Sequence, residues 1–172
     1  SVFVPDGYSH FAVTDVPKRG GHLYTVGIVG FAAMCHSAWA CGIGRRMLDM
    51  GTNHKTRVWA MIETPLAIFN ILEIAAAARD SETRLAGFVM GTNDLAKDTR
   101  ARLVPGRTPM LAWLSMCVAA ARVHGIDILD GVYNDIGNAG GFADECVQAR
   151  DMGFDGKTLI HPSQIEPCNA AF

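Results

Sequence analysis

The feature that most constrains the fold is the recurrence of short apolar runs at intervals of about one β-α unit. The runs predict strands at residues 58–63, 85–90, 126–133 and 154–160. Nearly continuous hydrophobic runs are typical of strands buried on both faces, as in a parallel sheet covered by helices. Helical patterns separate them at residues 65–78, 109–123 and 140–152. The predicted fold class is therefore α/β, with a parallel sheet and right-handed crossovers.

Two of the expected strands lead to a carboxylate. Glu63 ends the run that starts at Val58, and Asp94 follows the second run within Gly91–Leu95. Residues at the carboxyl ends of parallel strands face the ligand crevice in such folds. Converging carboxylates repel each other unless a cation or shared proton intervenes, and Mg²⁺ accepts one or two carboxylates together with water. We therefore interpret Glu63 and Asp94 as a metal site. The alternative is that Glu63 caps the following helix and Asp94 is a turn residue.

Other polar residues in or near the expected strands have two interpretations each. Asp130 interrupts an apolar strand, so it is either a crevice residue or a buried acid with a partner. Lys157 is expected to meet an anionic substrate or an acid. His161 precedes a proline, and we expect it to be a structural turn residue.

The predicted loops offer weaker signals. Arg100, Arg102 and Arg107 either meet the phosphates of a bulky substrate or belong to a solvated loop. The glycine-rich stretch 137–141 does not match a dinucleotide-binding pattern, and the start of a helix is a sufficient explanation for it.

Composition narrows the class of protein. The chain has 172 residues, 49% of them hydrophobic and 19% charged, which is typical of one soluble domain. A formal charge of −2 provides no basic field, so nucleic acid is not an expected partner. The five cysteines form no CxxC pair and two lie in predicted helices, which favours reduced thiols and a cytoplasmic protein.

Residues 23–44 carry no Asp, Glu, Lys or Arg and are followed by two arginines, so they meet a crude test for a membrane span. Their glycines, cysteines and polar residues keep the mean hydropathy modest, and the rest of the chain has a soluble α/β pattern. A buried or poorly ordered segment is therefore the expected alternative, and a membrane location is not favoured.

With these motifs together, the chain resembles the citrate lyase beta subunit-like CoA ester lyases of the HpcH/HpaI aldolase superfamily. Four motifs carry the resemblance, in the same order as in the family. They are Met61–Pro65, Gly91–Leu95, Ile128–Asp135 and Gly153–Gln164.

The resemblance implies a (β/α)₈ TIM-type barrel that makes or cleaves a carbon–carbon bond in a hydroxyacyl-CoA thioester such as malyl-CoA or citramalyl-CoA. It implies that Glu63 and Asp94 bind Mg²⁺ and are catalytic, and that Glu63, Asn93 and Asp130 contact substrate. Retro-aldol cleavage then yields an acyl-CoA, by way of its enolate, and a 2-oxo acid such as glyoxylate or pyruvate. The alternative from another class is a non-catalytic remnant or regulatory subunit of the same fold.

The chain also departs from the family pattern. A complete barrel needs about 250 residues, so we expect only a partial barrel, incomplete at both ends. Residues 57–172 are interpreted as the C-terminal half of the barrel and residues 1–56 as a poorly matching segment, with residues 18–54 resembling nothing in the family. A half-barrel leaves two sheet edges unpaired, which predicts a homo-oligomer.

Overall fold

The computed structural model describes residues 57–172, which form one compact unit. The expectations for the segment 1–56, including the possible membrane span at 23–44 and two of the five cysteines, lie outside the described residues. Within residues 57–172, no helix is both long and apolar enough to cross a membrane.

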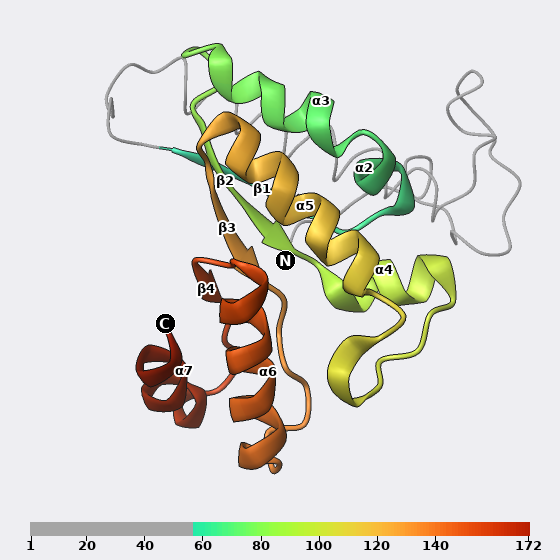
Figure 1. Ribbon diagram of the computed structural model, residues 1–172, viewed down its shortest axis with the longest axis vertical. Coiled ribbons are helices and arrows are strands. Elements are labelled where there is room, and N and C mark those ends of the chain that lie inside the picture. The colour runs from blue at the N-terminus through green and yellow to red at the C-terminus, as the bar shows by residue number, and fades with distance from the viewer. Residues whose placement is uncertain (1–56) are drawn as a thin grey trace, which may run out of the picture. The chain divides into compact units, whose positions relative to one another are not determined.

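A four-stranded parallel sheet organises this unit, and its spatial order follows the chain (Figure 1). The strands are β1 (Val58–Ile62), β2 (Leu85–Met90), β3 (Asp127–Asp130) and β4 (Gly156–Lys157). Each strand pairs in parallel with the next one along the chain. Sequential order and parallel pairing are the arrangement of one sector of a (β/α) barrel. The predicted parallel α/β sheet is confirmed.

Two strands are shorter than predicted. The expected strands 126–133 and 154–160 reduce to β3 and β4 because the ladder between them holds only two residue pairs, the last being Asp130 with Lys157. Beyond it, the Thr158 hydroxyl donates to the Asp130 carbonyl at 2.6 Å. The apolar residues that follow both strands therefore belong to loops at the carboxyl edge of the sheet, where ligands bind in such folds.

The helix predicted at 65–78 is divided by Asn70. The segments are α2 (Pro65–Phe69), α3 (Ile71–Ala76) and the 3₁₀ turn η3 (Ala77–Arg79). Thr64 begins the first segment, accepting a hydrogen bond from the Ala67 amide at 3.2 Å, and Pro65 fills the first helical position as expected. The Asn70 side chain donates to the Leu66 carbonyl at 2.9 Å, a local bond that competes with the regular helix.

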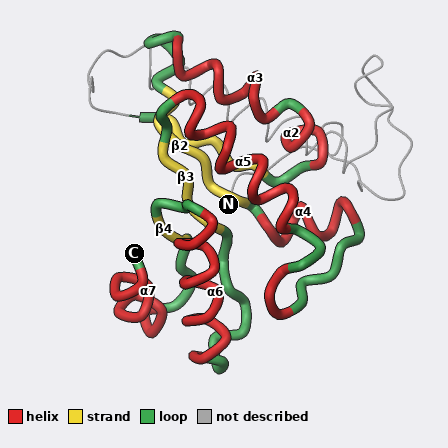
Figure 2. Tube along the Cα trace, viewed as in Figure 1, coloured by secondary structure: helices red, strands yellow, loops and turns green. Residues whose placement is uncertain are grey.

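Six further helical segments of the described residues follow the later strands (Figure 2). They are α4 (Thr92–Thr99), the turn η4 (Pro105–Arg107), α5 (Leu111–His124), α6 (Ala139–Met152) and, after the turn η5 (Pro162–Gln164), α7 (Ile165–Ala171). The helices predicted at 109–123 and 140–152 correspond to α5 and α6. Helix α4 was not predicted, since its region was assigned to a polar loop. It places Asp94 in the first turn of a helix directly after β2.

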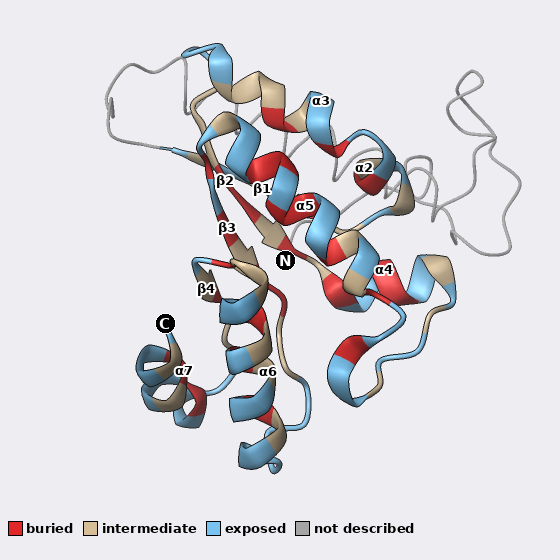
Figure 3. Cartoon of the chain, in the orientation of Figure 1, coloured by how far each residue is buried: buried red, intermediate tan, exposed pale blue. Residues whose placement is uncertain are grey.

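The main core lies between the sheet and the helices α3 and α5, which pack against each other (Figure 3). Its fully buried side chains include Phe88 from β2, Ile128 from β3 and Leu114 from α5. A smaller cluster of Phe142, Cys146 and Cys168 joins α6 to α7. His161 begins η5, and its Nδ1 accepts from the Ser163 amide at 3.2 Å, so the expected turn role is confirmed.

Cys117 and Cys146, the two cysteines within the predicted helices, are both buried, and the burial of Cys117 has a consequence at alkaline pH. Burial raises the pKa of the Cys117 thiol to about 12 from an ordinary value of 9.0. The folded state therefore keeps a proton that the unfolded chain loses above pH 9. This contribution to stability is present below pH 9 and is lost as the pH rises toward 12.

We expect the free energy of unfolding to fall between pH 8 and pH 10.5, with Cys117 supplying about 2 kcal/mol of the loss. The measurement is urea unfolding at both pH values for the wild type and for Cys117→Ala. The variant should be less stable at pH 8 but should lose less on going to pH 10.5. A variant whose loss equals that of the wild type would show that this thiol does not cause the pH dependence.

Candidate functional site

The carboxyl ends of β1 and β2 bring the two predicted metal ligands to the same edge of the sheet. Ile62 pairs with Met90 at the ends of these strands, and the Gly91 amide then donates to the Ile62 carbonyl at 2.9 Å. Glu63 is the next residue after β1 and is half-buried. Asp94 is exposed in the first turn of α4. The positions expected from the strand pattern are therefore those that the structure has.

The structural alternative for Glu63 is wrong, because Thr64 and not Glu63 caps the following helix. For Asp94, the alternative of a turn residue is replaced by a helical position. It is a first-turn helical acid and not a turn residue, and a negative charge there is favourable near the positive end of the helix dipole. That placement leaves its exposed carboxylate available to a ligand.

The residues present fit Mg²⁺. Gly91 lies against Glu63 so closely that a Cβ built on it would overlap the Glu63 Cβ and lie 3.0 Å from Oε2, so the glycine leaves room for this carboxylate. Among residues 57–172 no group of three or more His, Cys, Asp or Glu side chains forms a closed metal cage. A pair of carboxylates with open positions suits Mg²⁺, which keeps water and substrate oxygens in its coordination shell.

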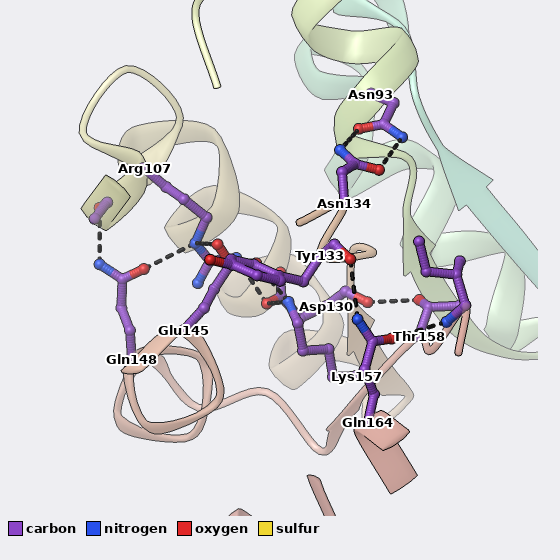
Figure 4. A network of polar contacts seen from close by, with 12 residues as sticks. Asn93, Arg107, Asp130, Tyr133, Asn134, Glu145, Gln148, Lys157, Thr158 and Gln164 are labelled. Atoms are coloured by element: carbon purple, nitrogen blue, oxygen red, sulfur yellow. Dashed lines mark hydrogen bonds and ion pairs between the residues drawn. The ribbon is translucent and has the colours of Figure 1, made fainter. Parts of the chain in front are cut away.

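Asn93, a predicted substrate contact, is exposed and forms a reciprocal amide pair with Asn134 (Figure 4). Asn93 Nδ2 donates to Asn134 Oδ1 at 3.1 Å, and Asn134 Nδ2 donates to Asn93 Oδ1 at 2.8 Å. This pair ties the start of α4 to the loop that follows β3. Each amide still has hydrogen-bonding capacity beyond the pair.

Asp130, the other predicted substrate contact, has no exposed surface. Arg107 Nη1 donates to its two carboxylate oxygens at 2.7 and 2.6 Å, and Lys157 Nζ donates to Oδ2 at 2.8 Å (Figure 4). The sequence left open whether Asp130 is a crevice residue or a satisfied core acid. Its burial and its two cationic partners favour the core acid over a direct contact with substrate.

Lys157 completes this ionic cluster. Its ammonium group lies between Asp130 and Glu145, donating to Glu145 Oε1 at 2.7 Å. The sequence predicted that Lys157 meets an anionic substrate or an acid, and the structure shows two acids. The cluster therefore connects β3, β4 and α6 across the carboxyl edge of the sheet.

Sequence reasoning named Arg107 without finding its role, and it missed Glu145 and Gln148 of the same cluster. A solvated loop was the simplest expectation, but the side chain is only 5% exposed, with Nε donating to Gln148 Oε1 at 2.8 Å. Gly106 has φ +75° and Arg107 itself has φ 53°, a tight turn that directs the chain back toward α6. The Pro105–Gly106 pair was the one signal for this turn, and it did not distinguish Arg107 from Arg100 or Arg102.

A cavity of about 260 Å³ opens beside this cluster. Its walls come from the loop before α5, from the loop after β3, from the first residue of α4 and from α6. Gly131, at the end of β3, lies so close to Thr92 that an added Cβ would overlap the threonine side chain. Thr92 also lines the cavity, and it lies two residues before Asp94 in the first turn of α4.

Three comparisons relate the chain to known proteins. The family described as HpcH/HpaI aldolase/citrate lyase matches residues 22–162, so the match extends over most of the segment 18–54, where the motifs above find no counterpart. A (3S)-malyl-CoA thioesterase of Cereibacter sphaeroides is 54% identical over 115 residues, covering 67% of this chain and 39% of that protein. The chain thus spans about two fifths of the length of this curated relative.

Solved structures give the same result for the fold. RipC from Yersinia pestis has a TM-score of 0.65 at 30% identity, covering 73% of this chain and 56% of that one. The citrate lyase beta subunit from Mycobacterium tuberculosis, complexed with oxaloacetate and magnesium, has a TM-score of 0.60 at 32% identity, covering 69% of this chain and 53% of that one. The predicted fold class, part of a TIM-type barrel, is confirmed. The chain belongs to the HpcH/HpaI aldolase/citrate lyase family.

Proposed function

We propose that this chain carries the metal-binding part of a Mg²⁺-dependent active site that acts on a hydroxyacyl-CoA thioester by carbon–carbon cleavage. The observation that carries the proposal is that Glu63, directly after β1, and Asp94, in the first turn of the helix after β2, follow the carboxyl ends of adjacent parallel strands. A relative of the same fold binds magnesium together with the 2-oxo acid oxaloacetate, which supports this chemistry.

Each residue has a defined task in this proposal. Glu63 and Asp94 would hold the ion, which when bound would orient the substrate oxygens and stabilise negative charge developing on the thioester oxygen. Asn93 would use the remaining hydrogen-bonding capacity of its amide to orient a substrate oxygen. Asp130 would act at a distance, by fixing the loop that carries Asn134. In the reaction, the substrate hydroxyl loses its proton to solvent and becomes the carbonyl of the 2-oxo acid as the bond between its carbon and the thioester α-carbon breaks. The α-carbon keeps the electron pair of that bond, as an enolate, until it is protonated.

A second candidate is hydrolysis of the same class of thioester. The observation that favours it is the relative named (3S)-malyl-CoA thioesterase, which is 54% identical over the shared region. In this reaction water adds to the thioester carbonyl and the CoA thiol leaves, giving a free hydroxy acid. Both reactions develop negative charge on the thioester oxygen. An ion held by the same two carboxylates would therefore stabilise the transition state of either reaction.

The first test is Mg²⁺ binding by calorimetry. We expect saturable binding in the wild type and at least a tenfold loss in Glu63→Gln and in Asp94→Asn, because each removes one charged ligand. The matched control is Asp98→Asn, an exposed acid one turn further along α4, which should bind as the wild type does. Equal Mg²⁺ affinity in all four proteins would show that Glu63 and Asp94 are not ligands of the ion.

The products of malyl-CoA then separate the two reactions. Acetyl-CoA with glyoxylate indicates carbon–carbon cleavage, whereas malate with free CoA thiol indicates hydrolysis. A folded chain that binds Mg²⁺ and forms neither set of products would support the alternative, a non-catalytic member of the family.

A further inference from the structure

A groove lies between α3 and α5, on the side of these helices that faces away from the sheet. The two helices pack side by side (Figure 1), and the groove has a volume of about 550 Å³. Its walls come from α3, the end of α2, η3 and the last turn of α5. The opposite sides of the helices hold core residues, such as Ile71 and Ala75 on α3 and Leu114 on α5. The groove is therefore a surface feature, and none of its lining residues belongs to the candidate site.

The groove exposes large apolar side chains. Phe69 is 83% exposed, Val123 63% and Leu72 55%. Helix α5 continues this apolar surface, because it carries no charged residue before Arg122 and its exposed side includes Met116. A helix that is apolar over most of its surface is typical of a buried position, and large apolar patches on a protein surface mark interaction sites. These exposures indicate that another surface covers the groove.

Closure of the barrel would leave this face uncovered. In a (β/α) barrel the helices form the outer ring around the strands, so further β-α units extend the sheet and the ring sideways. The groove opens on the outer side of two helices of that ring, since their inner sides hold the core. The surface that covers it therefore comes from outside the barrel.

The charges of the groove indicate which surface fits. Glu73 and Arg79 both line it and are both exposed, six residues apart in the chain. Among residues 57–172, neither side chain has an ion-pair partner. In a two-fold symmetric interface, residue i of one copy contacts residue j of the other, and j contacts i. One acid and one base on the same patch are therefore complementary to a second copy of that patch. A nucleic acid or an anionic membrane would instead require a basic surface.

We propose that the groove between α3 and α5 is the contact face of a two-fold symmetric homodimer. Glu73 of each copy pairs with Arg79 of the other, and Phe69, Leu72 and Val123 are buried between the two copies. This contact is made by helices, and it differs from the pairing of free sheet edges that the sequence pattern suggests. It leaves the carboxyl edge of the sheet open.

The test is analytical ultracentrifugation of the chain over a range of concentrations. Wild type should sediment as a dimer, with twice the 18.5 kDa mass of the chain. Glu73→Arg and Arg79→Glu should each weaken dimerisation at least tenfold, because each places like charges opposite each other. The matched control is Glu166→Arg, a reversal of an exposed acid on α7, which should dimerise as the wild type does. Circular dichroism checks that each variant is folded.

Combining the two reversals distinguishes a second copy from any other partner. The double variant restores opposite charges across the two-fold axis, and it should dimerise as the wild type does. An equal mixture of the two single variants should form a heterodimer, in which both pairs again join opposite charges.

Three results would overturn the proposal. A folded wild type that stays monomeric would mean that a different molecule covers the groove. Single reversals that dimerise as the wild type does would place the contact elsewhere, for example at the sheet edges. A loss of dimerisation that neither the double variant nor the mixture restores would show that Glu73 and Arg79 do not meet across a two-fold axis.

Discussion

Replacing Asp130 with alanine is expected to lower the free energy of unfolding by about 3–5 kcal/mol. The reason is that Arg107 and Lys157, both buried, would keep only Glu145 as a counter-charge after Asp130 is removed. An uncompensated buried cation costs far more than the net value of the ion pair that held it. Urea unfolding followed by circular dichroism measures the loss.

The matched control is Asp151→Ala, which breaks an exposed ion pair instead of a buried one. Arg150 and Asp151 are 3.0 Å apart, but their side chains are 49% and 63% exposed. Exposed pairs contribute about 0–1 kcal/mol because solvent and salt screen them. If the two variants unfold at the same urea concentration, the cluster around Asp130 does not stabilise this fold.

The sheet was predictable from the sequence because its signal is local. The runs that form β1 and β2 are apolar along their whole length, and each leads to a polar residue at the carboxyl end. Parallel pairing then requires that Glu63 and the start of α4 share one edge. The edge of the sheet at which both carboxylates lie therefore followed from strand spacing, whereas the helical position of Asp94 did not.

Helix α4 was missed because its residues are poor helix formers in isolation. It begins Thr92–Asn93–Asp94 and ends at Thr99, with few apolar residues to mark a face. The buried Thr92, Leu95 and Ala96 hold it against the rest of the chain. Tertiary packing overrides the weak local preference here, and a single sequence does not show that packing.

The partners in the ionic cluster could not be predicted from the sequence for a related reason. An acid within an apolar strand predicts that a partner exists, but the identity of that partner depends on contacts between distant segments. Arg107 lies 23 residues before Asp130, and Lys157 lies 27 residues after it. The sequence offered three loop arginines as equally good partners for Asp130. The turn at Gly106 places one of them, Arg107, against α6.

Replacing Gly91 with alanine is expected to reduce Mg²⁺ affinity at least tenfold while the chain still folds. Gly91 has φ −89°, so its backbone accepts any residue, and the effect of the change is steric. The added Cβ would overlap the Glu63 Cβ and lie 3.0 Å from Oε2, which forces the carboxylate out of its position. Overpacking of this kind costs about 1–3 kcal/mol of stability. Calorimetry measures the affinity, and urea unfolding measures the stability.

Gly140→Ala is the matched control for this prediction. Gly140 lies in α6, where the nearest atom to an added Cβ is Asn138 Oδ1 at 3.9 Å. Alanine there should leave Mg²⁺ affinity unchanged and raise stability by up to about 1 kcal/mol, since alanine favours helix over glycine. Unchanged affinity in a folded Gly91→Ala variant would mean that Mg²⁺ does not depend on the position of Glu63. In that case the ion, if it binds, would be held from Asp94 and other residues.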